Sequence, residues 1–239
     1  VGLKGVARDV EVPSGLAIIM VGEAGENIIG VAPGANARLL PSDLAHLKEM
    51  LAGAGVLMLQ LEIPQETVRY ALEMAKEMGI MTIMDPAPFR PLPADIYYLV
   101  DIMTPNETEA EALTGIPAHD LSGARRAGEE LVRRGVGSVI VTLGRNGALL
   151  VRRGGSLHIP GVPVDAVDTT AAGDAFNGAL ACAVAQRWPL EEAIHYANCA
   201  AALSVTKMGA QSSLPNKDEI DALYERVKGI GRFPYEGLW

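Results

Sequence analysis

Short apolar runs separated by helical stretches restrict the fold of this chain more than any other feature of its sequence. Three such runs are V56-L-M-L-Q-L-61, I80-M-T-I-M-84 and G137-S-V-I-V-T-142, and each has the length of a buried strand. Residues 65–78, between the first two runs, have the apolar spacing of an amphipathic helix. Strands that are apolar on both faces and alternate with helices are typical of a parallel sheet covered on both sides. The sequence therefore predicts an α/β fold with a mostly parallel central sheet and helices on both of its faces.

The rest of the chain continues this alternation behind an amino-terminal hairpin. Residues 14–21 and 27–32, joined by E23-A-G-E-26, have the pattern of the two hairpin strands. The other predicted strands cover residues 101–104, 148–151 and 157–159. The other predicted helices are a short one after Asn106 and those over residues 41–52, 123–134, 172–186, 190–206 and 216–228. Because no internal repeat or low-complexity linker marks a boundary, residues 1–239 are expected to form one domain.

The charge balance limits the kind of partner. The chain has 239 residues and a formal net charge of −9, from 20 basic and 29 acidic side chains. Since no long Lys or Arg cluster occurs, a small molecule is expected as the partner rather than nucleic acid or an anionic membrane. No apolar run approaches the roughly 18 residues of a membrane span. The first residues lack the order of a secretory signal, so a cytoplasmic location is expected.

The residue types that commonly bind metals or form disulfides give no signal of either. Cys182 and Cys199 are expected to be reduced thiols in the core. The four histidines, His46, His119, His158 and His195, show no metal-ligand spacing. The histidines are therefore interpreted as surface residues or as residues with satisfied hydrogen bonds.

The segment D168-T-T-A-A-G-D-174 places small residues between two aspartates, where a loop leads into the predicted helix 172–186. Without bulky side chains, backbone N–H groups there can approach a phosphoryl group, which the helix dipole also favours. Asp174, among these donors, could take a proton from a hydroxyl nucleophile. The spacing alone also fits a helix start that Asp168 or Asp174 caps, with alanines that allow close packing.

Asn106 and Glu109 allow two interpretations as well. Their spacing after Pro105 is that of a capping box, in which each side chain bonds the backbone of the other residue. Alternatively, Glu109 lies at the carboxyl end of a strand and could order a water or Mg²⁺ near phosphates. The sequence leaves both open.

T142-L-G-R-N-G-147 follows a predicted buried strand and contains an Asn-Gly pair, the usual signal of a tight hairpin turn. In the functional alternative, Gly144 and Gly147 let a nucleotide lie against the backbone and the Thr142 hydroxyl bonds a phosphate. The chain has neither the P-loop pattern nor the G-x-G-x-x-G pattern of dinucleotide sites.

The order and context of these segments resemble the ribokinase family of ATP-dependent sugar and nucleoside kinases over nearly the whole chain. D168-T-T-A-A-G-D-174 resembles the carboxyl-terminal signature of the family. The other matching segments are T104-P-N-E-T-E-A-E-111, L61-E-I-P-64, D85-P-A-P-88, T142-L-G-144 and G209-A-Q-S-S-213. The resemblance implies a three-layer α/β sandwich and the transfer of phosphate from ATP to a sugar, with conversion of D-ribose to D-ribose 5-phosphate as the expected reaction.

The resemblance also implies a role for each matching residue. Asp174 would deprotonate the primary hydroxyl of the sugar, Ala171, Ala172 and Gly173 would form the anion hole, and Glu62 would hydrogen-bond the sugar. The residues implied to bind the nucleotide are Asn106, Thr142, Gly144, Arg145, Gly147, Gly173 and Asn198.

Two cations follow from the same resemblance. Mg²⁺ would accompany ATP and be held by Glu109 through water. An activating monovalent cation, K⁺, would lie beside the anion hole, partly on backbone carbonyl groups. The residues implied to hold the monovalent cation are Asp168, Thr170, Ser204, Lys207, Gly209 and Ser213.

The chain departs from the family at its amino-terminal end. Family members run to about 300 residues and begin with a strand that carries a sugar-binding aspartate, followed by lid strands and a Gly-Gly-Lys-Gly-Ala-Asn type segment. Residue 1 matches a point about 80 residues into such a protein, so these parts are expected to be missing. Residues 1–35 would then be the rest of the lid hairpin and residues 36–239 the nucleotide-binding and catalytic core. The missing first strand would leave an exposed apolar edge on the sheet.

This departure leaves three functions open. The chain could be an active ribose kinase, a nucleotide-binding remnant that does not phosphorylate sugar, or a kinase for fructose, a deoxysugar or a nucleoside. Because the lid also carries the dimer contact of the family, the resemblance leaves a homodimer open too.

Overall fold

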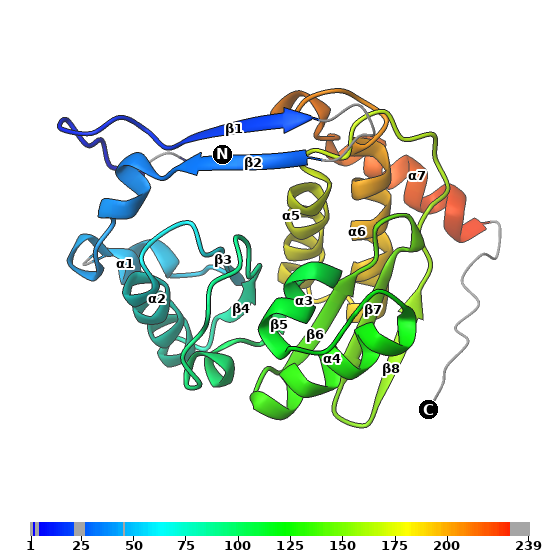
Figure 1. The fold of residues 1–239 in the computed structure, drawn as a ribbon, viewed down its shortest axis with the longest axis horizontal. Helices are drawn as coiled ribbons and strands as arrows, with labels where there is room; N and C mark the ends of the chain where they lie inside the picture. Colours follow the sequence, from blue (N-terminus) through cyan, green and yellow to red (C-terminus); the bar gives the residue numbers. More distant parts are fainter. Residues whose placement is uncertain (1, 3–4, 22–26, 45, 230–239) are drawn as a thin grey trace.

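A six-stranded sheet lies at the centre of the computed structural model, which describes residues 2, 5–21, 27–44 and 46–229 (Figure 1). Its strands lie in the order β3-β4-β5-β6-β7-β8 and have the bounds Val56–Leu59, Met81–Met84, Ile102–Met103, Ser138–Thr142, Ala148–Arg152 and Gly155–Ile159. Strands β3 to β6 pair in parallel, and β7 and β8 pair antiparallel with their neighbours. The mostly parallel sheet predicted from the apolar runs is confirmed.

Both faces of the sheet are buried at its central strands, which explains why these strands are apolar without alternation. Successive residues of a strand point to opposite faces. Along β6, Val139 and Val141 lie in one hydrophobic core and Ile140 lies in the other. Ile83 and Met84 of β4 divide between the two cores in the same way.

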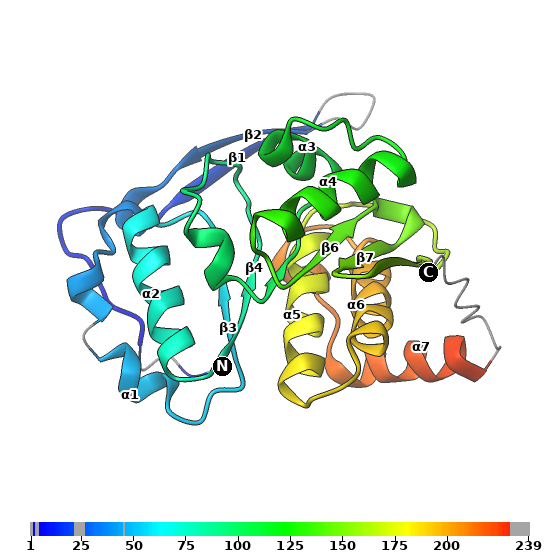
Figure 2. The same cartoon turned by 90° about the horizontal axis from the view of Figure 1, so that it is seen from below.

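Helices cover both faces (Figure 2). One core is closed by α2, α3 and α4, with the bounds Gln65–Glu77, Glu107–Thr114 and Leu121–Arg134. The other core is closed by α5, α6 and α7, with the bounds Ala172–Ala185, Leu190–Ser204 and Lys217–Gly229. The predicted arrangement of helices on both faces is therefore confirmed. None of the helices among the described residues is long and apolar enough to cross a membrane.

Two short turns replace the single helix predicted over residues 41–52. They are the 3-10 helix η2 (Pro41–Leu44) and the helix α1 (Leu47–Leu51). The backbone N–H of Leu40 donates to Asp43, which caps the first turn. His46, with φ −93° and ψ 0°, precedes α1 and departs from helical geometry. The prediction of one continuous helix was wrong because these local contacts interrupt it.

The amino-terminal hairpin forms a separate two-stranded antiparallel sheet of β1 (Leu16–Val21) and β2 (Asn27–Ala32). Its predicted turn, residues 23–26, lies outside the described residues. The 3-10 helix η1 (Gly34–Arg38) follows β2. Gly34 adopts φ 53°, and a Cβ atom there would lie 2.4 Å from the carbonyl oxygen of Pro13, so only glycine suits this crossing. Figure 1 shows the hairpin extended across the side of the molecule on which α5 begins.

Two further predictions concern the sheet edge and the cysteines. In the described part of the chain β3 pairs on one side only, and Met58 is exposed on that strand, as expected for an apolar edge. Both cysteines are free thiols, as predicted. Cys199 is buried, and burial raises its pKa to about 12. Cys182 is exposed on α5, so its predicted place in the core was wrong.

Candidate active site

The polar residues at the carboxyl ends of β4, β5 and β6 meet at one edge of the sheet. Asp85 directly follows β4 and Thr104 directly follows β5, and the N–H of Thr104 donates to the carbonyl of Met84 at 3.0 Å. The next residues continue the contact, because Asn106 forms an isolated parallel bridge with Thr142 at the end of β6. This edge is where ligands bind in open parallel sheets.

The helix α5 begins at this edge without a side-chain cap. Its N-cap residue, Ala171, adopts a left-handed conformation with φ 61°, and neither Asp168 nor Asp174 bonds the free N–H groups of the first turn. A Cβ atom built on Gly173 would meet no neighbour within 4 Å, so the space above that backbone is open. The N–H of Ala172 donates to the carbonyl of Thr169 at 3.3 Å, and the helix start offers the N–H groups of Gly173 and Asp174 and the positive end of the dipole to an anion. Asp174 lies in the first turn, exposed beside these donors.

The structure brings Asp85 close to two other acidic residues, Glu109 and Asp174. The pKa of Asp85 is raised to about 7, mainly by burial and then by the negative charges of Glu109 and Asp174, against the hydrogen bonds from Ala87 and Asn177. Burial also raises the pKa of Glu109, although hydrogen bonds with Asn106 oppose the change. The site thus concentrates negative charge where a cation or a proton would lower its energy.

Three polar residues of this edge had no role assigned from the sequence: Asp85, Thr104 and Asn177. Asn177 lies on α5, only 5% exposed, and its Nδ2 donates to Asp85 Oδ2 at 2.8 Å. Among buried side chains of the described residues, Thr104 Oγ1 and Asn177 Oδ1 have no hydrogen-bond partner. The sequence offered a signal for two of these residues: Asp85 is an acid directly after a buried strand, and Asn177 is an amide three residues after Asp174.

The capping box predicted for Asn106 and Glu109 is present. The N–H of Glu109 donates to Asn106 Oδ1 at 2.8 Å, and the N–H of Asn106 donates to Glu109 Oε2 at 2.9 Å. The capping box therefore uses the Oδ1 of Asn106 and the Oε2 of Glu109. Their predicted parts in phosphate and Mg²⁺ binding stay predictions, and both residues lie at the same strand ends as Asp85.

The donor set of this edge fits Mg²⁺ only together with other ligands. Carboxylate, amide and hydroxyl oxygens are what Mg²⁺ prefers, and it usually keeps several waters. In the described part of the chain, no three His, Cys, Asp or Glu side chains come together closely enough to hold a metal ion. Water and phosphate oxygens would therefore complete the coordination of an ion held by Glu109.

The loop 142–147 is a wider turn than the predicted Asn-Gly turn. The strands β6 and β7 pair as far as Thr142 and Ala148, and the 3-10 helix η4 (Gly144–Asn146) lies between them. A Cβ atom on Gly147 would lie 2.2 Å from the carbonyl oxygen of Ile159, so packing against β8 already requires glycine there. By contrast, no neighbour lies within 4 Å of the Cβ position of Gly144. Gly144 is therefore the glycine of this loop that leaves its backbone accessible.

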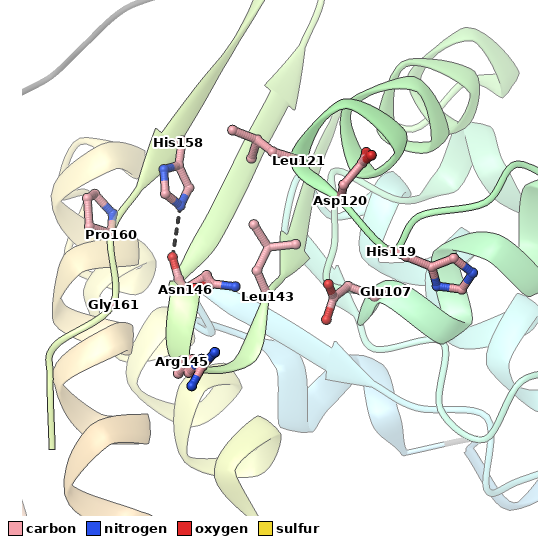
Figure 3. A pocket seen from close by; sticks show the side chains of 10 residues that line it. All are labelled: Glu107, His119, Asp120, Leu121, Leu143, Arg145, Asn146, His158, Pro160 and Gly161. Carbon is pink, nitrogen blue, oxygen red and sulfur yellow. Dashed lines mark hydrogen bonds between the residues drawn. The ribbon is translucent and has the colours of Figure 1, made fainter. Parts of the chain in front are cut away.

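A pocket of about 350 Å³ lies beside this loop (Figure 3). Its walls come from the start of α3, the turn before α4, the 143–146 loop and the end of β8. They include Arg145 of the predicted nucleotide loop, but no residue of the 168–174 segment. His158 Nε2 lies 2.8 Å from the carbonyl oxygen of Asn146 and joins two of the walls.

Asn198 and Glu62, predicted to contact the adenine and the sugar, differ in accessibility. Asn198 is buried on α6, and its Nδ2 donates to the carbonyls of Ile159 and Pro160 at 3.3 and 3.1 Å. These two hydrogen bonds connect the end of β8 to α6. Glu62 is exposed just beyond β3, where the N–H of Leu61 donates to the carbonyl of Ala87. The predicted ligand contacts of both residues stay predictions.

The residues predicted for the monovalent cation come from two loops that the structure brings together. Asp168 accepts the N–H groups of Thr170 and Gly209, both at 2.9 Å. Hydrogen bonds from Thr170, first through its side chain, and from Gly209 lower the pKa of Asp168. Lys207 Nζ forms an ion pair with Glu219 at 3.0 Å, which offsets its charge. Ser204 and Ser213 are buried and donate to the carbonyls of Ala201 and Ala210.

Comparison with known proteins gives the family. A family model described as pfkB family carbohydrate kinase matches residues 1–217. A ribokinase of Haemophilus influenzae is 41% identical over 206 residues, which are 86% of this chain and 67% of that protein. A deoxyribokinase of Salmonella typhi is 40% identical over 209 residues, which are 87% of this chain and 68% of that protein. The chain thus spans about two thirds of the length of these relatives.

A solved structure supports the same assignment. The Arabidopsis thaliana ribokinase complexed with ribose and ATP matches with a TM-score of 0.84 and 32% identity, over 90% of this chain and 70% of that chain. The predicted ribokinase-like sandwich is therefore confirmed. Fold, sequence match and relatives agree: the chain belongs to the pfkB family of carbohydrate kinases, ATP-dependent phosphotransferases that act on the hydroxyl group of a sugar or nucleoside.

Proposed function

We propose that this chain phosphorylates the primary hydroxyl of D-ribose with ATP, giving D-ribose 5-phosphate and ADP. The observation that carries the proposal is the uncapped start of α5, where an exposed aspartate, Asp174, stands beside unpaired N–H donors at the ligand-binding edge of the sheet. The relative from Haemophilus influenzae is a ribokinase, and the Arabidopsis protein was solved with ribose and ATP, which supports the choice of sugar.

In the proposed reaction, Asp174 takes the proton of the sugar hydroxyl as that oxygen attacks the γ-phosphorus of ATP. A new O–P bond forms, the bond between the γ-phosphorus and the bridging oxygen breaks, and ADP leaves with the electron pair. The N–H groups of residues 171–174 stabilise the charge on the transferred group, since they lie at a helix start that no side chain caps. This segment would therefore contribute in two ways. Its carboxylate accepts the proton of the sugar hydroxyl, and its N–H groups stabilise the transferred phosphoryl group.

Two cations would assist these residues. Glu109, with Asn106, would hold the Mg²⁺ of the nucleotide through water, which neutralises charge on the phosphates. The monovalent cation K⁺ would be held by the 168–170 and 204–213 loops, where Asp168 supplies the carboxylate. Thr142, Gly144, Arg145, Gly147 and Asn198 remain the residues proposed to contact the nucleotide.

The test of the proposal is Asp174→Asn. This change removes the base but keeps the size of the side chain, so we expect the turnover number to fall by about 100-fold or more. Nucleotide affinity, measured by isothermal titration calorimetry, should stay within about 3-fold, because the N–H donors are unchanged. The matched control is Asp165→Asn, an exposed aspartate of the preceding loop, which should keep the parent turnover. A turnover number of Asp174→Asn within a few-fold of the parent would refute the mechanism.

A deoxyribose kinase is the second candidate, because the Salmonella relative of nearly equal identity is a deoxyribokinase. Phosphate transfer to a panel of D-ribose, 2-deoxy-D-ribose, fructose and a nucleoside distinguishes the two. A remnant that binds nucleotide without transfer is the third candidate, since the chain spans about two thirds of its relatives. Such a remnant would show heat of binding for ATP or ADP and none for any sugar.

A further inference from the structure

The hydrogen bond between Asp85 and Asn177 joins the sheet to the helix that carries Asp174. Asn177 Nδ2 donates to Asp85 Oδ2 at 2.8 Å across 92 positions of the sequence. The other carboxylate oxygen of Asp85 accepts the N–H of Ala87 at 3.2 Å, and the N–H of Asp85 itself donates to the carbonyl of Leu59 at 2.9 Å. Backbone groups at the end of the sheet therefore fix the position of Asp85, and the Asp85 carboxylate accepts the hydrogen bond from α5.

Stability does not explain why Asn177, the buried member of this pair, is polar. Asn177 is 5% exposed, and its Oδ1 has no hydrogen-bond partner. A buried polar atom without a partner lowers stability, and buried charged or polar pairs can often be replaced by apolar residues without loss. The neighbouring residues of α5, among them Phe176 and Leu180, are buried and apolar, so an apolar residue at 177 would suit this core. A polar pair kept at such a cost indicates a role in function.

The apolar packing of α5 is mainly against α6 rather than against the sheet. Its buried face consists largely of alanines, and its N-cap residue Ala171 contributes no side-chain hydrogen bond. Apolar contacts have no preferred direction, whereas a hydrogen bond to a carboxylate does. Among the described residues, the bond from Asn177 is the only side-chain hydrogen bond that connects α5 to the sheet.

We propose that Asp85 and Asn177 are positioning residues for phosphoryl transfer: their hydrogen bond sets the rotation of the first two turns of α5, and so places Asp174 and the N–H groups at the helix start. Asn177 follows Asp174 by three positions, so the two residues lie on neighbouring positions of one helix face. The inference rests on the proposed function of Asp174.

Exchange of the two partners tests the proposal. Asn177→Asp places a second carboxylate against Asp85, which should push α5 away from the sheet. We expect the turnover number to fall by about 100-fold, as for a displacement of reacting groups by about 1 Å, while the KM for ATP changes less than about 3-fold. The double variant Asp85→Asn with Asn177→Asp restores an amide–carboxylate pair with the partners reversed. It should recover the turnover number to within about 3-fold of the parent, which a double-mutant cycle with Asp85→Asn quantifies.

The matched control removes a hydrogen bond of similar length elsewhere. Tyr196→Phe deletes the bond from the Tyr196 hydroxyl to Asp221, 2.8 Å long, between α6 and α7. It should lower the melting temperature but leave the turnover number unchanged. Should Asn177→Asp fail to fold, Asn177→Ala removes the amide without adding charge and is compared with the same control.

Hydrogen exchange separates this inference from the proposed function. In Asn177→Asp, the amides of residues 175–179 should exchange faster while those of α4 keep the parent rates, and the double variant should restore protection. If the parent phosphorylates no sugar, the proposed function fails, and exchange alone decides whether the pair positions α5. Parent turnover and parent protection in Asn177→Asp would overturn the inference. So would a double variant that regains the parent melting temperature without regaining protection and turnover.

Discussion

Asn177 and Asn198 are buried amides on the neighbouring helices α5 and α6, but their hydrogen bonds differ in kind. Asn198 donates to two backbone carbonyls at the end of β8, as expected of a residue that holds the fold. Asn177 donates to a carboxylate and leaves its own oxygen unpaired. Since buried polar groups are normally satisfied, the unpaired oxygen of Asn177 needs an explanation beyond the fold.

The buried histidine His195 makes the stability of the fold depend on pH. It is buried on α6, and burial lowers its pKa to about 4 from the ordinary value of 6.5. The folded protein therefore disfavours the charged ring, so its contribution to stability is complete above pH 6.5 and is lost as the pH falls from 6.5 through 4. The loss should amount to about 3 kcal/mol at most. Urea unfolding of the parent and of His195→Gln over this range measures it.

A second titrating group, Asp85, changes stability over the same pH range, so the experiment on His195 needs a control. The pKa of Asp85 is raised to about 7, so its stability contribution is lost as the pH rises and has the opposite sign in part of the same range. Only the difference between parent and variant therefore isolates His195. His119→Gln, the same change at an exposed histidine, is the matched control for the substitution itself. Equal slopes for the parent and His195→Gln would contradict the prediction.

At the scale of elements, the start of α3 combines a structural and a proposed chemical task. Asn106 caps the helix through Oδ1, and its amide nitrogen is proposed to serve the nucleotide. The start of α4 provides a comparison, because Asp120 caps it through a bond of 2.6 Å to the N–H of Gly123 without any proposed ligand. Substitutions at the two caps can thus separate the tasks.

We predict that Asn106→Ala lowers the free energy of unfolding by about 1 kcal/mol, like Asp120→Ala, because each removes a cap. Asn106→Asp should keep the stability of the parent, since aspartate caps equally well. It should nevertheless weaken nucleotide binding, because it replaces the amide donor with a negative charge. Urea unfolding and isothermal titration calorimetry measure the two effects. Unchanged nucleotide affinity in Asn106→Asp would leave Asn106 with the cap alone.

At the scale of the whole molecule, the sheet is a middle layer with a core on each side. Leu149 and Leu150 are adjacent residues of β7, and they belong to the two different cores. Their exposed fractions are 2% and 1%. In a sheet with one solvated face, one of two such neighbours would be exposed.

Leu149→Ala and Leu150→Ala should therefore both be costly. Each change leaves a cavity in a closed core, so we expect each to lower the free energy of unfolding by about 2–5 kcal/mol. Urea unfolding of the two variants checks this, with the exposed Leu121→Ala as the matched control of small effect. A neutral result at either position would mean that one face of the sheet is not closed.

Local sequence patterns were enough to predict the type and order of the main elements. Apolar runs without alternation predicted buried parallel strands, because both faces of such strands must be covered, and the spacing of Asn106 and Glu109 predicted their capping box. Local patterns of this kind are readable because the forces that act on them lie within a few residues. Where a local contact was missed, as at Asp43 in the expected helix 41–52, the boundary was wrong.

Which of these residues contact one another depends on the folded arrangement of the elements. The bond from Asn177 to Asp85, the charges that raise the pKa of Asp85, and the contact of Asp168 with Gly209 each join positions far apart in the chain. Packing also distinguishes two glycines of one loop. A Cβ atom on Gly147 would clash with the carbonyl of Ile159, whereas the Cβ position of Gly144 has no neighbour within 4 Å. Such contacts depend on the order of strands in the sheet and on the placement of helices against it, which no local pattern encodes. Glu109 and Asp174 therefore lie near Asp85 only through the fold.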